Sequence, residues 1–323
     1  MATIKDVAQR SGISIKTVSR VINGASSVRA NVRAKVEQAI RDLNYRPALA
    51  ARQLASGRSF IVAMIAPRLT FSYFAGLMVA SASACRAAGH HLVLEVVDAA
   101  ELSQHGQWQL QLSCEPDAVI VVPPFSDDPR MIEALCALGK PLVRIAGKND
   151  GIGHSVEVHD HAIAQEMAAY LVGKGHTRLA MIAPPHSQMA AEERLEGFRD
   201  GLAEHGIELA ASCIVRGTMR FESGVAAFKE LMALPQRPTA IFAANDVMAL
   251  GAMSTALRLG FRVPQDIAIA GFDNAVEGQM CFPTLTSIHQ PIEEIAEAAV
   301  NLALGRGHGA GSFHHRLVIR ESA

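Results

Sequence analysis

Short apolar segments alternate with helix-like segments through most of the chain, from Ser59 onward. Seven of them have the length of a buried strand, and they occupy residues 60–66, 91–97, 118–122, 142–145, 179–183, 240–243 and 267–270. Continuous apolar strands separated by amphipathic helices are typical of a parallel sheet covered by helices on both faces. Because the segments are too many for one small sheet, we expect an α/β body of two doubly wound parallel-sheet subdomains.

The strand-like segments also suggest where the two subdomains meet. We expect the first to span about residues 59–158 and the second about 159–284. Two further segments, at 286–288 and near Leu317, are expected to cross back between them. Residues 285–323 would then be shared by the two subdomains, and residues 59–323 would form one body.

Charge divides the chain where this body begins. The first 58 residues hold 11 Lys and Arg against 3 Asp and Glu, whereas the remaining 265 hold 19 against 28. A basic module joined to an acidic body indicates that the front end binds a polyanion. The N-terminus lacks the order of a secretory signal, and no apolar run is long enough to span a bilayer. We therefore expect a cytoplasmic protein that does not enter a membrane.

The basic module has the pattern of a helix-turn-helix. Thr3-Ile4-Lys5-Asp6 has the form of a capping box and predicts a short helix that ends at about Ser11. Gly12 can take the left-handed turn conformation, and Ser14 can cap a second helix over residues 15–22. Two short helices joined by a glycine turn form a helix-turn-helix.

A third helix is predicted over about residues 30–43. Its apolar side chains recur at helical spacing, at Val32, Val36, Ile40 and Leu43. It would complete a three-helix core, so we expect an all-α helix-turn-helix DNA-binding domain over residues 1–46.

The second helix leaves one face exposed, with groups that can donate to phosphates and reach into a major groove. The residues on this face are Ile15, Lys16, Thr17, Ser19 and Arg20, with Asn23 at the end of the helix. A lysine favours guanine O6 and N7, whereas an isoleucine offers only apolar contact, for instance with a thymine methyl. The alternative is the charged, solvated face that any small basic bundle has.

Residues 47–58 are predicted to form a hinge between the basic module and the body. Pro47 can begin and Gly57 can end a helical stretch of about two turns, which is too short to be stable unaided. Leu49 and Leu54 need a partner, so we expect the hinge to fold only against DNA and a second copy of itself, with a leucine available as a wedge in the minor groove. The alternative is an ordinary linker.

Aromatic and polar residues follow the predicted strands of the body, where open parallel sheets bind ligands. They are Tyr73, Phe74, Pro123, Arg194, Phe221, Asn245 and Asp273. Aromatic faces beside Asp, Asn and Arg suit a neutral polyol. The structural alternatives are that Asp246 caps a helix and that Arg194 pairs with Glu193 or Glu196 at the surface.

Other signals carry no chemistry. The G-x-G-x-x-A match at 305–310 follows a helix rather than a strand, so we interpret it as a loop. The histidine pairs, which include His90-His91 and His314-His315, fit no zinc pattern and are interpreted as surface residues. No G-x-S-x-G elbow is present. We expect no catalytic centre, no metal, no cofactor and no enzymatic activity.

The run T-I-K-D-V-A-x-x-x-G-I-S-x-x-T-V-S-R-V-I-N, followed by L-N-Y-R-P and A-x-x-L, resembles the signature of the lactose/galactose repressor (LacI/GalR) family. In the body, G-H-T-R-L-A-M-I-A, A-I-F-A-A-N-D-V-M-A-L-G-A, V-P-Q-D-I-A-I-A-G-F-D-N and L-T-S-I-H-Q-P resemble the effector domain of that family. That domain is similar to type I periplasmic binding proteins. The resemblance covers essentially the whole chain and makes residues 59–323 an effector-binding and dimerisation domain.

The resemblance also implies roles for individual residues. Base edges would be contacted by Ile15, Lys16 and Arg20, and phosphates by Thr3, Thr17, Ser19 and Asn23, with Ser14 on the same DNA-facing side. Leu54 would intercalate at the centre of a palindromic operator. The effector would be held by Arg194, Asn245 and Asp273. The sequence departs from the family at His159, where relatives usually carry Asp, and in the loop at 184–188.

From these observations we expect a transcriptional regulator, a repressor, that binds a palindromic double-stranded operator as a homodimer under the control of a small-molecule effector. One helix-turn-helix and one short hinge per chain call for a symmetric site. No leucine-heptad segment follows the last strand-like run, so a dimer is expected rather than a tetramer. The effector is expected to be a sugar or sugar derivative. The alternatives are a purine or other flat ring and, in a different class, a binding or transport protein.

Overall fold

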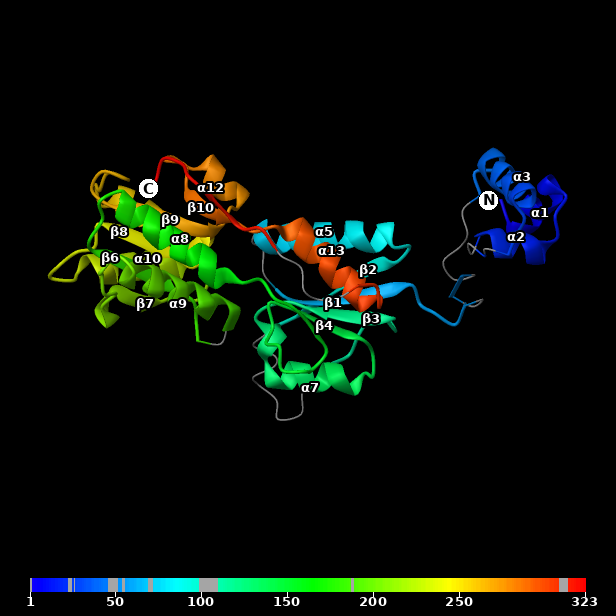
Figure 1. Ribbon diagram of the computed structural model, residues 1–323, viewed down its shortest axis with the longest axis horizontal. Coiled ribbons are helices and arrows are strands. Elements are labelled where there is room, and N and C mark those ends of the chain that lie inside the picture. Colours follow the sequence, from blue (N-terminus) through cyan, green and yellow to red (C-terminus); the bar gives the residue numbers. More distant parts are fainter. Residues whose placement is uncertain are drawn as a thin grey trace. The chain divides into compact units, whose positions relative to one another are not determined.

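The computed structural model describes residues 2–22, 25, 27–45, 52–53, 56–68, 72–98, 110–186, 189–307 and 313–323 (Figure 1). The chain divides into two compact units, Met1–Phe60 and Ile61–Ala323. Within the described ranges, no helix is both long and apolar enough to cross a membrane.

The first unit is a three-helix bundle. Its helices are α1 (Ile4–Ser11), α2 (Ile15–Ile22) and α3 (Ala30–Asp42), so the predicted bounds of the first two are confirmed and the third ends one residue early. Gly12 follows α1 in the left-handed conformation, with φ of 68°. The apolar faces of the helices enclose a small core of Val7, Val18, Val21, Val36 and Ala39.

The predicted hinge is described only at residues 52–53 and 56–58; residues 52, 53 and 56 are helical, and the rest of the hinge, with Leu54, lies outside the described residues. Asn23 lies outside them as well. Gly57 has a left-handed conformation, with φ of 68°, and its amide donates to the Gln53 carbonyl oxygen at 2.9 Å.

The second unit contains two sheets. The first has the order β2-β1-β3-β4-β5, and all its neighbouring strands are parallel. Its strands are β1 (Ile61–Pro67), β2 (His91–Val97), β3 (Ala118–Val121), β4 (Leu142–Ile145) and β5 (His154–Val156). One face is covered by α5 (Ser72–Ala87) and α13 (Ile292–Ala303), and the other by α7 (Pro129–Ala137), which follows the short helix η1 (Phe125–Asp127) (Figure 1).

The second sheet has the order β11-β10-β9-β8-β6-β7 and is parallel except for the antiparallel pair β10 and β11. Its strands are β6 (Leu179–Ala183), β7 (Ile214–Arg216), β8 (Ala240–Ala243), β9 (Ala268–Asp273), β10 (Thr286–His289) and β11 (Arg316–Val318). Its helices are α8 (Asp160–Gly173), α9 (Met189–Ala203), η2 (Ala211–Cys213), α10 (Phe221–Met232), α11 (Asp246–Arg258) and α12 (Val276–Met280).

The doubly wound parallel sheets confirm the predicted fold class, and each of the seven predicted strands is present. Two differences have physical reasons. β5 and β7 are three residues long and only partly buried, so they lack the continuous apolar run that marks the others. The strands expected to cross between the sheets, β10 and β11, both belong to the second sheet. It is α13 between them that packs on the first sheet, because its Ile295, Ala299 and Val300 join the first core.

The chain therefore passes between the sheets three times. The first crossing lies between β5 and α8, the second between β10 and α13, and the third between α13 and β11. This arrangement brings residues from distant parts of the sequence to the same junction.

Candidate DNA-binding and effector sites

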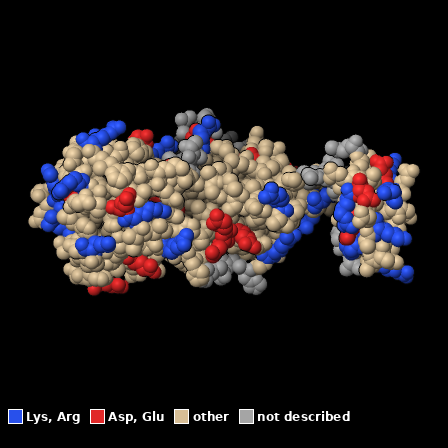
Figure 2. Space-filling view, turned by 90° about the horizontal axis from the view of Figure 1, so that it is seen from above, with Lys and Arg blue, Asp and Glu red and all other residues tan. Residues whose placement is uncertain are grey.

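Helix α2 buries one face and exposes the predicted recognition face. The Ser14 carbonyl oxygen accepts the amides of Thr17 and Val18 at 2.9 Å and so begins the helix. Since Val18 is buried in the core, Ile15, Lys16 and Arg20 lie on the outside, and Ile15 is 45% exposed. Figure 2 shows Lys and Arg side chains over much of the visible face of this unit.

Of the remaining predicted DNA contacts within the described residues, Thr3, Ser14 and Thr17 lie at or near the first turns of α1 and α2, and Ser19 lies in the middle of α2. The Thr3 hydroxyl accepts the Asp6 amide at 3.4 Å, and the Thr3 amide donates to the Asp6 carboxylate at 2.7 Å, which completes the capping box. The hydrogen bond from the Thr3 backbone lowers the pKa of Asp6. The hydroxyls of Ser14 and Thr17 lie 3.0 Å apart, and Ser19 is half-buried.

In the second unit, three of the predicted effector residues come together. Tyr73 at the start of α5, Arg194 on α9 and Asp273 at the end of β9 interact electrostatically. Burial raises the pKa of Asp273 to about 7, although the Arg194 charge acts to lower it. Burial, with the nearby Asp273 charge, also raises the pKa of the Tyr73 hydroxyl.

Arg194 is buried rather than paired at the surface with Glu193 or Glu196, so that alternative is wrong. It lies in the second turn of α9, and its Nε donates to Asp160 Oδ2 at 2.7 Å. Its guanidinium stands 3.7 Å from the centre of the Phe272 ring, and its Nη1 donates to the Ala244 carbonyl oxygen. Burial acts to raise the pKa of Asp160, but Arg194 and His315 together outweigh it and the pKa is lowered.

The turn that presents Asp273 is strained. Asp273 and Asn274 both have positive φ, 114° and 53°, which side-chain-bearing residues rarely adopt. The Asn274 amide donates to Ser287 Oγ at 3.0 Å, and Ser287 in turn donates to Asp246 Oδ1 at 2.6 Å. Asp246 also accepts the Ala275 amide at 2.6 Å. The buried Asp246 therefore fixes this turn. It does not cap a helix, which was the structural alternative, because the N-cap of α11 is Asn245.

Asn245 has structural partners for both ends of its side chain. Its Oδ1 accepts the Met248 amide at 2.9 Å and caps α11, and its Nδ2 donates to the Met219 carbonyl oxygen at 3.1 Å. Phe74 meets Tyr73 edge to face, with ring centres 5.2 Å apart. Phe221 begins α10 and is 40% exposed, and Pro123 is half-buried after β3. A ligand role for these four residues remains a proposal.

Sequence reasoning missed three buried polar residues beside this group. Gln290 donates from Nε2 to Asp273 Oδ1 at 2.6 Å, and Asp160 joins Arg194. The His315 side chain is only 5% exposed, and its Nε2 lies 3.3 Å from Asp160 Oδ1. The interpretation of His315 as a surface residue is therefore wrong, and so is that of His90, which is buried. The partner of His315 is 155 residues away, so no local pattern could have revealed the pair.

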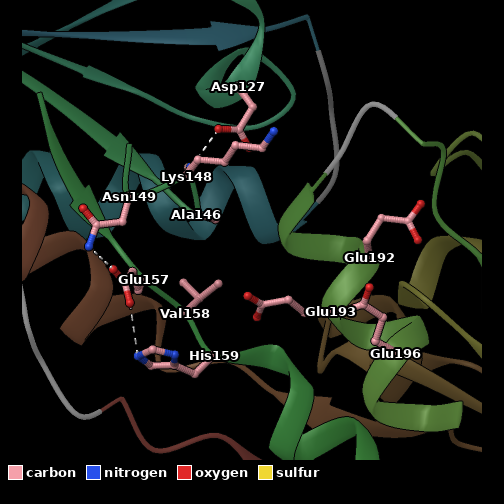
Figure 3. Close-up of a pocket in the computed structure, with 11 residues that line it drawn as sticks. Asp127, Ala146, Lys148, Asn149, Glu157, Val158, His159, Glu192, Glu193 and Glu196 are labelled. Atoms are coloured by element: carbon pink, nitrogen blue, oxygen red, sulfur yellow. Dashed lines mark hydrogen bonds and ion pairs between the residues drawn. The ribbon is translucent and has the colours of Figure 1, made fainter. Parts of the chain in front are cut away.

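A cavity of about 370 Å³ opens next to these residues, between the loops after β4 and β5 and the helix α9 (Figure 3). Five carboxylates line it, from Asp127, Glu157, Glu192, Glu193 and Glu196, together with Lys148 and His159. Glu193 links it to the buried group, since its Oε2 accepts the Asp160 amide at 3.1 Å. Burial and the charge of Asp160 raise the pKa of Glu193. Within the described residues, no three His, Cys, Asp or Glu side chains gather as metal ligands would.

Comparison with known proteins matches both units. Residues 3–48 match the profile of the bacterial regulatory proteins of the lacI family, and residues 168–322 match that of the periplasmic binding protein-like domain. The chain is 34% identical over 311 residues to the HTH-type transcriptional repressor PurR of Erwinia tasmaniensis, covering 95% of this chain and 90% of the relative. It is 31% identical over 307 residues to the ribose operon repressor of Escherichia coli strain K12, covering 95% and 93%.

Two solved structures share the fold over the whole length. A lac repressor dimer bound to operator and the anti-inducer ONPF has a TM-score of 0.73 and 27% identity, covering 99% of this chain and 98% of that chain. A complex of the transcriptional regulator CelR with cellobiose has a TM-score of 0.71 and 26% identity, covering all of both chains.

Proposed function

We propose a function on the premise that this chain belongs to the LacI family of bacterial regulatory proteins. As a member of that family it is a DNA-binding transcriptional regulator with an effector-binding domain, and not an enzyme. The proposal concerns which residues contact DNA, which contact the effector, and what the effector is.

On the DNA side, we propose that a homodimer places one α2 helix in each half of a palindromic operator. Lys16 and Arg20 are exposed on the face of α2 opposite its buried Val18, so they can reach base edges while the core stays intact. Thr3 and Ser14 sit at helix N-termini, where hydroxyls and backbone amides suit phosphate oxygens. Because its target is the operator, the protein acts in the cytoplasm.

On the effector side, we propose a sugar or sugar derivative. The observation that carries this is the buried pair of Arg194 and Asp160 with the half-buried Asp273 and Tyr73 beside it, at the junction of the two sheets. Charged, hydrogen-bonding side chains next to an aromatic ring match a ligand with many hydroxyls and apolar ring faces. A ligand held between the sheets would change their separation and, through β1, the spacing of the two hinges.

A purine is the second candidate. The edge-to-face pair of Tyr73 and Phe74 supports it, as does the 34% identity with PurR. A transport or binding role is disfavoured because such a protein has no use for the basic helix-turn-helix unit.

Binding-site selection with the full chain and genomic fragments tests the proposal. We expect enrichment of a palindrome with two half-sites about one helical turn apart. The selection is then repeated with the sugars and purines that raise the melting temperature of the effector unit. Failure to enrich any duplex would contradict the operator proposal, and enrichment changed only by purines would replace the sugar with the second candidate.

A further inference from the structure

We infer that Asp160 and His315 belong to the effector site, where together they bind one hydroxyl group of an uncharged ligand. The inference rests on the proposed function, because it concerns the same site at the junction of the sheets. It assigns binding roles to two residues that the sequence pattern did not single out.

The first reason is that these two side chains are buried and that the contact between them falls short of a hydrogen bond. Asp160 is fully buried, and the His315 side chain is 5% exposed. Asp160 Oδ1 and His315 Nε2 lie 3.3 Å apart, but the contact lacks hydrogen-bond geometry, and neither atom has another hydrogen-bond partner within the described part of the chain. Because a buried polar atom without a hydrogen bond destabilises the fold, such atoms indicate a site that something else completes.

The second reason is position. Asp160 follows the first crossing between the sheets, and His315 ends the third. Both lie close to the proposed effector residue Arg194: Asp160 Oδ2 accepts from Arg194, and the His315 ring lies 6.2 Å from the Phe272 ring that the Arg194 guanidinium covers. Crossing segments are where two subdomains hinge. Opening the sheets would expose the pair to a ligand, and closing them would bury both.

The chemistry of the two atoms selects the group they bind. A carboxylate oxygen only accepts a hydrogen bond, and an imidazole nitrogen donates or accepts according to its tautomer. A hydroxyl does both at once, donating to Asp160 Oδ1 and accepting from the Nε2 hydrogen of His315. A phosphate or carboxylate could satisfy the histidine but would face the Asp160 carboxylate without a proton to share.

The surrounding charges also favour an uncharged ligand. Asp273 interacts electrostatically with Asp160 and Arg194, and Glu193 accepts the Asp160 amide. The adjoining cavity carries five carboxylates against Lys148 and His159 (Figure 3). An anion brought to this junction would meet more negative than positive side chains in a region of low dielectric.

The test begins with calorimetric titration of the full chain against D-ribose, D-glucose, D-galactose, cellobiose, hypoxanthine and guanine, with ribose 5-phosphate and glucose 6-phosphate as matched anions. The tightest ligand and its single-deoxy analogues are then titrated into the wild type, His315→Ala, His315→Gln and Asp160→Asn. His314→Ala is the matched control, because His314 is the exposed neighbour.

We expect His315→Ala to weaken the parent ligand at least tenfold and His314→Ala to leave it unchanged. One deoxy analogue should bind wild type and His315→Ala equally, because its missing hydroxyl is the one that His315 holds. His315→Gln, which keeps a donor, should recover part of the affinity, and Asp160→Asn should weaken the same hydroxyl contact.

Two results would overturn the inference alone: an equal loss in His315→Ala for the parent and every deoxy analogue, or tighter binding of a sugar phosphate than of its parent sugar. Binding of none of the eight compounds by the wild type would instead reject the proposed effector function, and this inference with it.

Discussion

The two units of this protein differ in where their charged and polar side chains lie. The helix-turn-helix unit has an apolar core of five residues and carries its charged and hydroxyl groups outside. The effector unit has a large apolar core and also buries charged side chains, among them Arg144, Asp160, Arg194 and Asp246, each 7% exposed or less.

Function and stability should therefore be coupled in the effector unit and separable in the helix-turn-helix unit. On α2, a side chain such as Lys16 can change the DNA sequence preference without touching the core. In the effector unit, Arg194 and Asp160 are at once proposed ligand residues and an ion pair that the fold depends on. Substitutions there should change both properties, whereas substitutions on α2 should separate them.

The largest effect should follow from Arg194→Met. It removes the cation that faces the fully buried Asp160, and breaking a buried pair by removing one partner costs about 3–5 kcal/mol. Chemical denaturation should show this loss in the unfolding of the effector unit only. Arg262→Ala, which breaks the exposed pair with Asp266, is the control and should have no measurable effect. Equal stability of the two variants would contradict the coupling.

Asp273→Asn should change how stability depends on pH. The folded pKa of Asp273 is raised to about 7 from an ordinary value of 3.8, so its contribution to stability is complete below pH 4 and is lost as pH rises to 7. Between pH 4 and pH 7, the free energy of unfolding of the wild type should fall by about 1 kcal/mol per pH unit more than that of the variant. A smaller loss should persist in the variant, because burial also raises the pKa of Asp246. Denaturation curves at pH 4.5, 6 and 7.5 measure the free energy of unfolding of both proteins. The same dependence of that free energy on pH in the two proteins would contradict this prediction.

Lys16→Ala should relax the preference for one base pair in each half-site by about 1–3 kcal/mol. Since Lys16 is exposed, neither unit should lose stability. Competition binding on operators that differ at single positions measures the change. A specificity profile identical to that of the wild type would remove Lys16 from the set of base contacts.

Thr3→Ala should have the smallest effect. It removes the hydroxyl of the capping box, and loss of such a cap costs about 1 kcal/mol. The cost should fall on the helix-turn-helix unit, with the effector unit unchanged. Calorimetry that showed a shift in the effector transition instead would mean that the units do not unfold independently.

The same contrast explains what could be predicted from the sequence. The bounds of α1 and α2 follow from local signals, namely the Thr3 capping box, the Gly12 turn and the spacing of the valines, and the parallel strands follow from continuous apolar runs. The strand ends also point to Arg194 and Asp273. The contact between Asp160 and His315 could not be predicted, because the two residues are 155 positions apart and meet only after two further crossings between the sheets.

A single titration tests the link between the two units. The full chain is titrated on its selected operator and on a random duplex of equal length, with and without the sugar that most stabilises the effector unit. We predict a preference for the operator of about 10³-fold or more, and a change of at least tenfold in operator affinity when the sugar is bound. A sugar that binds the protein but leaves the affinity for both duplexes unchanged would contradict effector control of DNA binding.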